Sequence, residues 1–327
     1  MTVWIIFILC IILFLALDLG IFNRKAHVIS TKEATMWTII WVSMSLIFSG
    51  VIYWLYYSGN VDNIDNLTPR GATLKYITGY LIELSLSVDN IFVIAVIFNS
   101  FKIPRKYQHR VLFWGILGAI VFRALMILFG VVLIKKFFFT TYIFGAFLLY
   151  TAAKMLIKKD AEYHPKNSFV YRVLRRIMPV TTKMEGQSFF IQIRHIKAAT
   201  PLFIALVIIE FTDILFALDS VPAILAITSD PFLVFSSNIF AILGLRSMYF
   251  FLANMLAKFE YLKYSLVVIL SFVGVKLILS HHYDFPEWLS LSVIATSLAG
   301  GILISLSKKN KTSDDSPLEF QVDDSEE

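Results

Sequence analysis

Charged residues and cysteine are what this sequence has least of. Only 16% of its 327 residues are charged, against about a quarter in ordinary soluble domains, whereas 58% are hydrophobic. The mean hydropathy is +0.75. The single cysteine, Cys10, lies in an apolar stretch, so one chain can build neither a disulfide framework nor a thiolate metal cage. The composition predicts a membrane protein.

Catalytic signatures are absent as well. The loops contain no nucleophile elbow, phosphate-binding loop or zinc-protease pattern, and no intramembrane nucleophile can be identified. We therefore expect no enzyme and no bound cofactor. The net charge of +6 does not indicate a nucleic-acid partner, because the basic residues gather in loops between apolar spans.

Nine apolar stretches are long enough to cross a bilayer, which needs about 20 residues per helix. The first has no basic region before it and no small-residue cleavage site after it, so we interpret it as a retained helix. The expected fold is all-α, a polytopic transmembrane helix bundle with about nine spans. They run from Val3 to Phe22, Thr35 to Tyr57, Thr73 to Phe98, Val111 to Ile134, Phe138 to Ile157, Ala199 to Thr228, Phe232 to Leu256, Leu262 to Ser280 and Trp288 to Ser307.

The loop charges orient the chain. Placing the C-terminus inside puts most basic loop residues in the cytoplasm and most acidic ones outside, with Lys135 and Lys136 as exceptions. We therefore expect a multi-pass inner-membrane protein with its N-terminus outside and its C-terminus in the cytoplasm. The cytoplasmic group comprises Arg24, Lys25, Lys32, Lys102, Arg105, Lys106, Arg110, the stretch from Lys158 to Lys197, Lys308, Lys309 and Lys311; the external group comprises Asp62, Asp65, Asp230, Asp284 and Glu287.

The one long connection, from Lys158 to Lys197, contains a basic and amphipathic run from Phe169 to Met178. Two interpretations stay open: the run lies on the anionic inner leaflet, or it is a tethered cytosolic loop. The acidic tail from Asp314 to Glu327 is short of apolar residues, and we predict that it is disordered.

A three-span unit occurs twice. In the third and sixth spans one carboxylate precedes another by six places, and an amide or hydroxyl follows directly. The next two spans of each unit hold one arginine and then one lysine. Because each unit has three spans, the second copy enters the membrane the other way up, as in secondary transporters with a midplane site. The matching residues are Glu83, Asp89, Asn90, Arg123 and Lys154 in the first unit, and Asp213, Asp219, Ser220, Arg246 and Lys276 in the second.

The chain accordingly divides into six parts. These are two N-terminal helices (1–72), repeat 1 (73–157), a basic cytoplasmic loop (158–198), repeat 2 (199–280), the ninth helix (281–307) and an acidic cytoplasmic tail (308–327).

Charges inside the spans are the candidate functional residues, because each costs at least about 2.5 to 3.5 kcal/mol at the bilayer centre. Five acids but only two arginines lie deep within the spans, which leaves an excess of negative charge if all are ionised. A divalent cation or protons would neutralise most of that excess. Pairing with the arginines alone is disfavoured, because they are too few. Lys154 and Lys276 lie near span ends and can snorkel. The acids are Glu83, Asp89, Glu210, Asp213 and Asp219, and the arginines are Arg123 and Arg246.

Local geometry separates these acids. On a continuous helix Glu83, Ser87 and Asn90 share one face, whereas Asp89 points away and lies about 9 Å along the axis from Glu83. In the sixth span Pro222 frees a carbonyl beside Asp219, where we favour an ion site over a bare kink.

Ligand type narrows the ion. The histidines, at positions 27, 109, 164, 195, 281 and 282, all fall in predicted loops. Carboxylate, amide and carbonyl oxygens suit manganese, magnesium or calcium rather than zinc, copper or nickel. Exchange of metal for protons is a natural coupling hypothesis.

These motifs resemble the TerC family of membrane proteins, within the LysE-like superfamily, and most closely its Alx-type members. The resemblance covers nearly the whole chain except the acidic tail. It implies manganese export across the inner membrane, with the family's acidic residues on Glu83, Asp89, Glu210, Asp213 and Asp219. The matching stretches are residues 16–20, 24–27, 83–90, 199–203, 210–213, 216–224 and 241–246.

The leading hypothesis is a manganese exporter in which Asp89 and Asp219 face each other at the midplane. Asn90 and Ser220 would add neutral oxygens, and Glu83, Glu210 and Asp213 would bind metal or carry protons. The alternatives are export of calcium or of a small amine, or a non-transporting scaffold that uses the cytoplasmic loop to hold other proteins. The oligomeric state and the direction of transport stay open.

Overall fold

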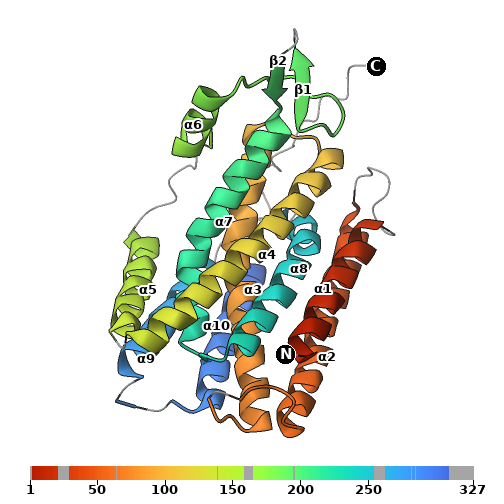
Figure 1. Ribbon diagram of the computed structural model, residues 1–327. Coiled ribbons are helices and arrows are strands. Elements are labelled where there is room, and N and C mark those ends of the chain that lie inside the picture. Colours follow the sequence, from red (N-terminus) through yellow and green to blue (C-terminus); the bar gives the residue numbers. More distant parts are fainter. Residues whose placement is uncertain are drawn as a thin grey trace.

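The computed structural model describes residues 2–20, 29–63, 65–137, 139–157, 165–193, 196–253, 262–280, 282–283 and 285–308. Several predictions fall outside these residues: the basic positions Arg24, Lys25, Lys158, Lys309 and Lys311, the histidines at 27, 164, 195 and 281, Asp284, and the acidic tail. The described part contains ten α-helices, one short 3-10 helix and one two-stranded hairpin (Figure 1).

Nine of the ten described α-helices coincide with the nine predicted spans. Eight of them are long and apolar enough to cross a membrane, and the apolar part of the first, Thr2–Ala16, is shorter. The prediction of an all-α polytopic bundle is confirmed. The nine are α1 (Thr2–Gly20), α2 (Thr31–Tyr57), α3 (Pro69–Ser100), α4 (Arg105–Lys136), α5 (Thr140–Ile157), α7 (Pro201–Leu225), α8 (Pro231–Ala253), α9 (Leu262–Leu279) and α10 (Glu287–Lys308).

Capping residues explain why several helices begin before the apolar stretches do. Ser30 caps α2, and Thr68 caps α3 by accepting from the backbone N–H of Gly71, with Pro69 next in the chain. Helix α4 begins directly after Pro104, six residues before the predicted span. The prediction that every histidine lies in a loop is therefore wrong for His109, which is inside α4.

Helix α3 lies at the centre of the bundle. It packs against α2, α7, α8 and α10, while α4 packs against α7 and α8, and α5 packs against α9. In the predicted repeat α3, α4 and α5 correspond to α7, α8 and α9. Under this correspondence the α3–α8 contact is equivalent to the α7–α4 contact, and the α5–α9 contact is equivalent to itself. The division into two repeats stays a prediction, and this pairing is the one that such an exchange would give.

The outer faces of the bundle are apolar. Ile47 on α2 and Leu128 on α4 are among many large hydrophobic side chains that are exposed, whereas most of α8 is buried. Because hydrocarbon rather than water solvates such a surface favourably, the multi-pass assignment follows from the fold as well as from the sequence.

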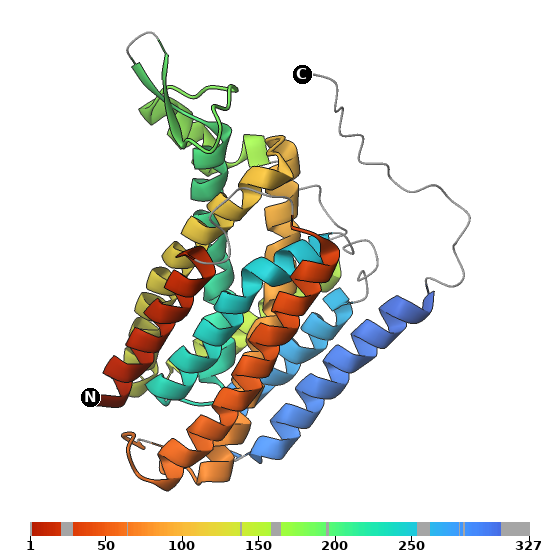
Figure 2. The same ribbon diagram turned by 90° about the vertical axis from the view of Figure 1, so that its right-hand side faces the viewer.

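The described part of the long connection folds at one end of the bundle. The 3-10 helix η1 (Pro165–Asn167) leads into α6 (Phe169–Ile177), which forms within the predicted amphipathic run. Strands β1 (Phe190–Ile193) and β2 (Ile196–Ala199) pair antiparallel, with Phe190 opposite Ala199. Figure 2 shows this hairpin projecting beyond the helices, next to α6.

Two glycines let α5 and α9 approach closely. A Cβ added at Gly145 would lie 2.8 Å from the backbone oxygen of Gly274. Because backbone cannot move aside as a side chain can, we expect Gly145→Ala to destabilise the bundle by about 1–3 kcal/mol. Thermal unfolding in detergent measures this. Gly50→Ala on α2, where a Cβ would meet nothing within 4 Å, is the matched control and should be neutral or stabilising. Equal melting temperatures for the two variants would contradict the close approach.

The turn between α7 and α8 is tied to α2 and to the α2–α3 loop. The Tyr56 hydroxyl donates to Asp230 Oδ2 at 2.7 Å, and Asp230 Oδ1 accepts from the backbone N–H of Phe232 at 2.9 Å. The Thr228 hydroxyl donates to Asp65 Oδ2 at 3.0 Å. Burial raises the pKa of Asp230 from its ordinary value of 3.8, and the Tyr56 hydrogen bond opposes that rise.

Tyr56→Phe should therefore cost about 1.5–3 kcal/mol at pH values where Asp230 is ionised, because it removes a hydrogen bond to a buried charge. The bond favours the ionised carboxylate, so its contribution is present above the folded pKa and is lost as the pH falls through it. Melting temperatures measured from neutral pH down to pH 4 give the difference. Tyr53→Phe on the exposed face of α2 is the control. A difference that does not change with pH would contradict this role of Asp230.

Candidate functional site

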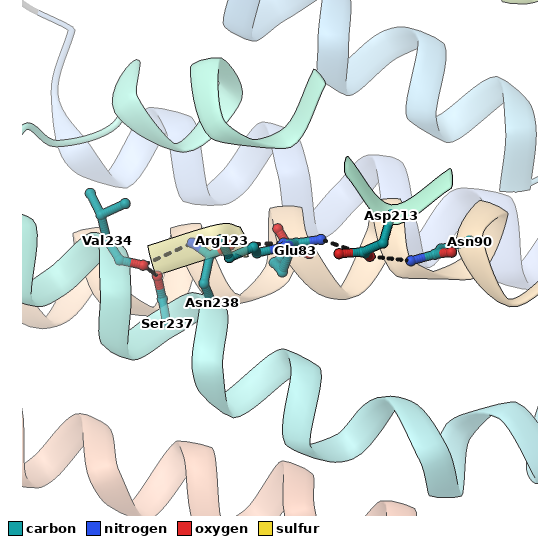
Figure 3. Close-up of polar contacts among 7 residues, drawn as sticks. All are labelled: Glu83, Asn90, Arg123, Asp213, Val234, Ser237 and Asn238. Atoms are coloured by element: carbon teal, nitrogen blue, oxygen red, sulfur yellow. Dashed lines mark hydrogen bonds and ion pairs between the residues drawn. The ribbon is translucent and has the colours of Figure 1, made fainter. Parts of the chain in front are cut away.

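A chain of polar side chains crosses the apolar centre of the bundle. Glu83 on α3 forms an ion pair with Arg123 on α4. Arg123 Nη2 lies 3.7 Å from Asp213 Oδ1 on α7, and the same oxygen accepts a 2.8 Å hydrogen bond from Asn90 Nδ2. Figure 3 shows these four side chains in one row. Arg123 therefore contacts two of the five acids, although two arginines are too few to pair with all five.

The far side of Arg123 is held by α8. Arg123 Nη1 donates to Asn238 Oδ1 at 2.9 Å, and Asn238 Nδ2 donates to the backbone oxygen of Val234 at 2.8 Å. Asn238 did not feature among the predicted site residues. Asn238 follows no carboxylate, unlike Asn90, which the repeated motif singled out directly after Asp89; an amide inside a predicted span was its only signal.

The row is nearly inaccessible to solvent. Glu83 is 1% exposed, Asn90 3%, Arg123 3% and Asp213 6%. In this row the carboxylates of Glu83 and Asp213 share the one guanidinium of Arg123. The net charge of the three groups is −1 if all are ionised. Because an uncompensated buried charge is costly, this arrangement favours a further positive charge.

Several oxygens around the row have no hydrogen-bond partner among the described residues. Buried polar atoms in folded proteins are nearly always paired, so a group of such oxygens is unusual. These atoms come from carboxylate, amide and hydroxyl groups and form the oxygen-rich donor set that hard divalent cations prefer. They are Glu83 Oε2, Ser87 Oγ, Asn90 Oδ1, Asp213 Oδ2 and Ser220 Oγ.

The facing positions of α3 and α7 are set by their antiparallel register. Asn90 meets Asp213, and the Ser220 hydroxyl lies beside the Glu83 carboxylate. The contact thus moves seven residues forward along α3 and seven residues back along α7, as in an antiparallel pair. Figure 1 shows the two helices running in opposite directions. The predicted repeats match Glu83 with Asp213 and Asn90 with Ser220, and under that match the two contacts are equivalent.

This register corrects the expectation that Asp89 and Asp219 face each other. In this register Asp89 and Asp219 are five residues out of alignment, or about 7.5 Å along the helix axes at 1.5 Å per residue. They lie on opposite sides of the point midway between the Glu83–Ser220 and Asn90–Asp213 contacts. The Asp219 Oδ1 atom instead accepts a 3.0 Å hydrogen bond from Thr151 on α5, and Lys154 on the same helix acts on it electrostatically. Asp89 is half-buried, as expected for a residue that points away from Glu83, Ser87 and Asn90, which are buried together.

Glu210 lies one turn from Asp213 against α4. A Cβ at Gly118 would overlap the Glu210 carboxylate, so the glycine provides the space in which that side chain lies. Glu210 Oε2 has no hydrogen-bond partner in the described structure, and Asp213 acts on Glu210 electrostatically. Glu210 thus adjoins the central row without being part of its chain of contacts.

The remaining predicted positions lie away from the row. Arg246 is buried in α8. Lys276 is also buried and donates to Ser290 Oγ of α10 at 2.8 Å, so it does not snorkel. Pro222 is inside α7, which continues to Leu225. Among the residues that the structure describes, no three His, Cys, Asp or Glu side chains form a group that could hold a metal. The central row itself combines two carboxylates with neutral oxygens.

Comparison with known proteins places the chain among membrane proteins of related sequence. Residues 69–313 match the pattern of the family described as "Integral membrane protein TerC family". A Myxococcus xanthus protein described as "Uncharacterized membrane protein STKORF319" is 49% identical over 305 residues, covering 93% of this chain and 92% of that protein.

Two further relatives are 42–43% identical to this chain. An uncharacterized membrane protein of Rickettsia bellii is 43% identical over 307 residues, covering 94% of this chain and 98% of that protein. An Escherichia coli K12 protein described as "Putative membrane-bound redox modulator Alx" is 42% identical over 289 residues, covering 88% and 89%. No solved structure matches the chain. With three quarters of its length matched by the family pattern, the chain belongs to the TerC family of integral membrane proteins.

Proposed function

We propose that this protein exports a divalent metal ion, manganese above all, through the row formed by Glu83, Asn90, Arg123 and Asp213. The observation that carries the proposal is the group of buried oxygens around that row, which has two carboxylates for one guanidinium. These oxygens suit manganese, magnesium and calcium better than zinc or copper.

Arg123 would act as the counter-ion when no metal is bound. Its guanidinium contacts both carboxylates, so an entering divalent ion would replace one positive charge with two in the same place. Glu83 Oε2, Asp213 Oδ2, Asn90 Oδ1 and Ser220 Oγ are the ligands that we assign to the ion. Arg123 would swing toward Asn238, which already accepts from it.

Protons are the proposed coupling ions. Glu210 adjoins Asp213 and is itself only half-buried, so its carboxylate can exchange protons with an aqueous path more readily than Glu83. Because Glu83 and Asn90 on α3 meet Ser220 and Asp213 on α7, rocking of one helix against the other would open the row to one side at a time.

The ends of the bundle differ in charge, which supports the proposed orientation in the inner membrane. The end where α3 meets α4 carries Lys102, Arg105 and Lys106 near α6, whereas Asp62 and Asp65 lie in the α2–α3 loop at the other end. With the basic end in the cytoplasm the C-terminus is inside and the N-terminus outside, as the positive-inside rule requires.

The substrate is tested by manganese flux into proteoliposomes, with calcium, magnesium and a small alkylamine as competitors. We expect flux that manganese saturates and that the amine does not reduce, because the buried carboxylate, amide and hydroxyl oxygens suit a small hard cation better than an organic one. Stronger competition by calcium than by unlabelled manganese would assign the protein to calcium. Absence of flux from intact protein would favour the scaffold, whose function should survive neutralisation of the five acids.

A further inference from the structure

A basic groove lies beside α6, away from the central row. Its volume is about 670 Å3, and it is lined by Tyr171 and four cationic side chains, those of Lys166, Arg172, Arg175 and Arg176. No carboxylate of the described residues lines it. Four positive charges around one groove are the recognition pattern of an anionic, phosphate-containing ligand.

The groove is built from a helix that the bundle holds in place. Ser168 caps α6 by accepting from the backbone N–H of Tyr171. Val170, Tyr171 and Leu174 pack against the buried cluster of α3, α4, α7 and α8, and the Tyr171 ring lies 5.8 Å from that of Phe101. The opposite face of α6 therefore presents its arginines outward.

The charge of these cations is not neutralised by acidic side chains of the described structure. None of the four groove cations forms an ion pair with a carboxylate of the residues that the structure describes. Arg175 lies 5.8 Å from the Tyr171 ring, a cation–π contact between two residues that line the groove. Because no carboxylate of the described residues neutralises them, the groove cations are available to a ligand.

The surroundings of the groove are apolar. Phe169 and Ile177, at the two ends of α6, are 68% and 70% exposed. Figure 1 shows α6 beside the upper part of α7 and above the end of α5. The outer faces of those helices expose Ile157, Leu215 and Leu218. Exposed apolar side chains next to cations at the end of a membrane bundle are typical of a lipid contact and would disfavour a site for a soluble anion.

We propose that this groove binds the phosphate of an anionic phospholipid, with the acyl chains along the outer faces of α5 and α7. Arg172 and Arg176 are one turn apart and would hold the phosphate from one side, while Lys166 approaches from η1. The site is distinct from the ion-transport row and does not depend on it, so each can fail in experiment without the other.

The test uses the full chain purified in detergent, with phosphatidylglycerol and phosphatidylcholine added and the bound lipids counted by native mass spectrometry. The double variant Arg172→Gln/Arg176→Gln should bind phosphatidylglycerol at least about tenfold more weakly, because each cation near an anionic headgroup contributes on the order of a fivefold gain. Lys106→Gln/Lys183→Gln removes two exposed charges from the same end but not from the groove, and should bind like wild type.

Three results would overturn the proposal. These are equal binding of both lipids by wild type, equal phosphatidylglycerol binding by the two double variants, and displacement of the lipid by millimolar inorganic phosphate, which would assign the groove to a soluble anion. Melting temperatures show whether the variants are folded, and both should match wild type because the four substituted side chains are exposed.

Discussion

Asp213→Asn is expected to lower manganese flux by about a hundredfold or more while leaving the protein folded. Asp213 contributes one of the two carboxylates of the central row and connects Arg123 to Asn90. An amide of the same shape keeps a hydrogen-bonding oxygen there but removes the charge that would hold a divalent ion. The measurement is initial manganese flux into proteoliposomes, normalised to reconstituted protein.

Asp62→Asn is the matched control, because it makes the same chemical change at an exposed residue of the α2–α3 loop. It should transport like wild type. If Asp213→Asn kept at least half of the wild-type flux, Asp213 would not be a ligand and the row would be a structural ion pair.

Arg123→Gln is expected to destabilise the metal-free protein by about 3–5 kcal/mol, because it leaves Glu83 and Asp213 buried without their shared counter-ion. Thermal unfolding in detergent with a chelator gives the effect, and Arg70→Gln, at an exposed position of α3, is the control. Manganese should raise the melting temperature of Arg123→Gln more than that of wild type, since the ion can take the place of the missing charge.

A second substitution separates charge from packing. Adding Glu83→Gln to Arg123→Gln should recover much of the lost stability, because the double variant no longer buries the uncompensated Glu83 charge. If the two substitutions were additive, the contact between Glu83 and Arg123 would not be the source of the loss.

The sequence was sufficient to predict the helices and one face of the site. Spans of about 20 apolar residues can form only helices in a membrane, so the nine stretches and the nine helices agree. Helical periodicity placed Glu83, Ser87 and Asn90 on one face, and these three side chains are buried together. The cost of a buried charge singled out Arg123 and the five acids as candidate functional residues, and Arg123 contacts two of those acids.

Contacts between helices were harder to predict. The repeat matches Asp89 with Asp219, but symmetry relates two positions without requiring that they touch. The register of α3 against α7 decides which residues meet, and it is set by packing along the whole contact. Thr151 for Asp219 and Ser290 for Lys276 are neutral partners on other helices, and no charge pattern indicates such residues in advance.

The helix ends were missed for a simpler reason. Hydropathy marks the part of a helix inside the hydrocarbon, whereas the caps of α3 and α4 lie in polar sequence beyond it. His109 was consequently assigned to a loop although it lies in the second turn of α4.

Direct manganese binding to the purified protein tests most sharply whether the row of Glu83 and Asp213 is the ion site. Electron paramagnetic resonance can count bound manganese for wild type and for two double variants, Glu83→Gln/Asp213→Asn and Asp89→Asn/Asp219→Asn. Each double variant neutralises two carboxylates. We predict that the first double variant loses the bound ion and that the second retains it with at most a modest loss of affinity. Retention by the first and loss by the second would contradict the assignment and move the site to Asp89 and Asp219.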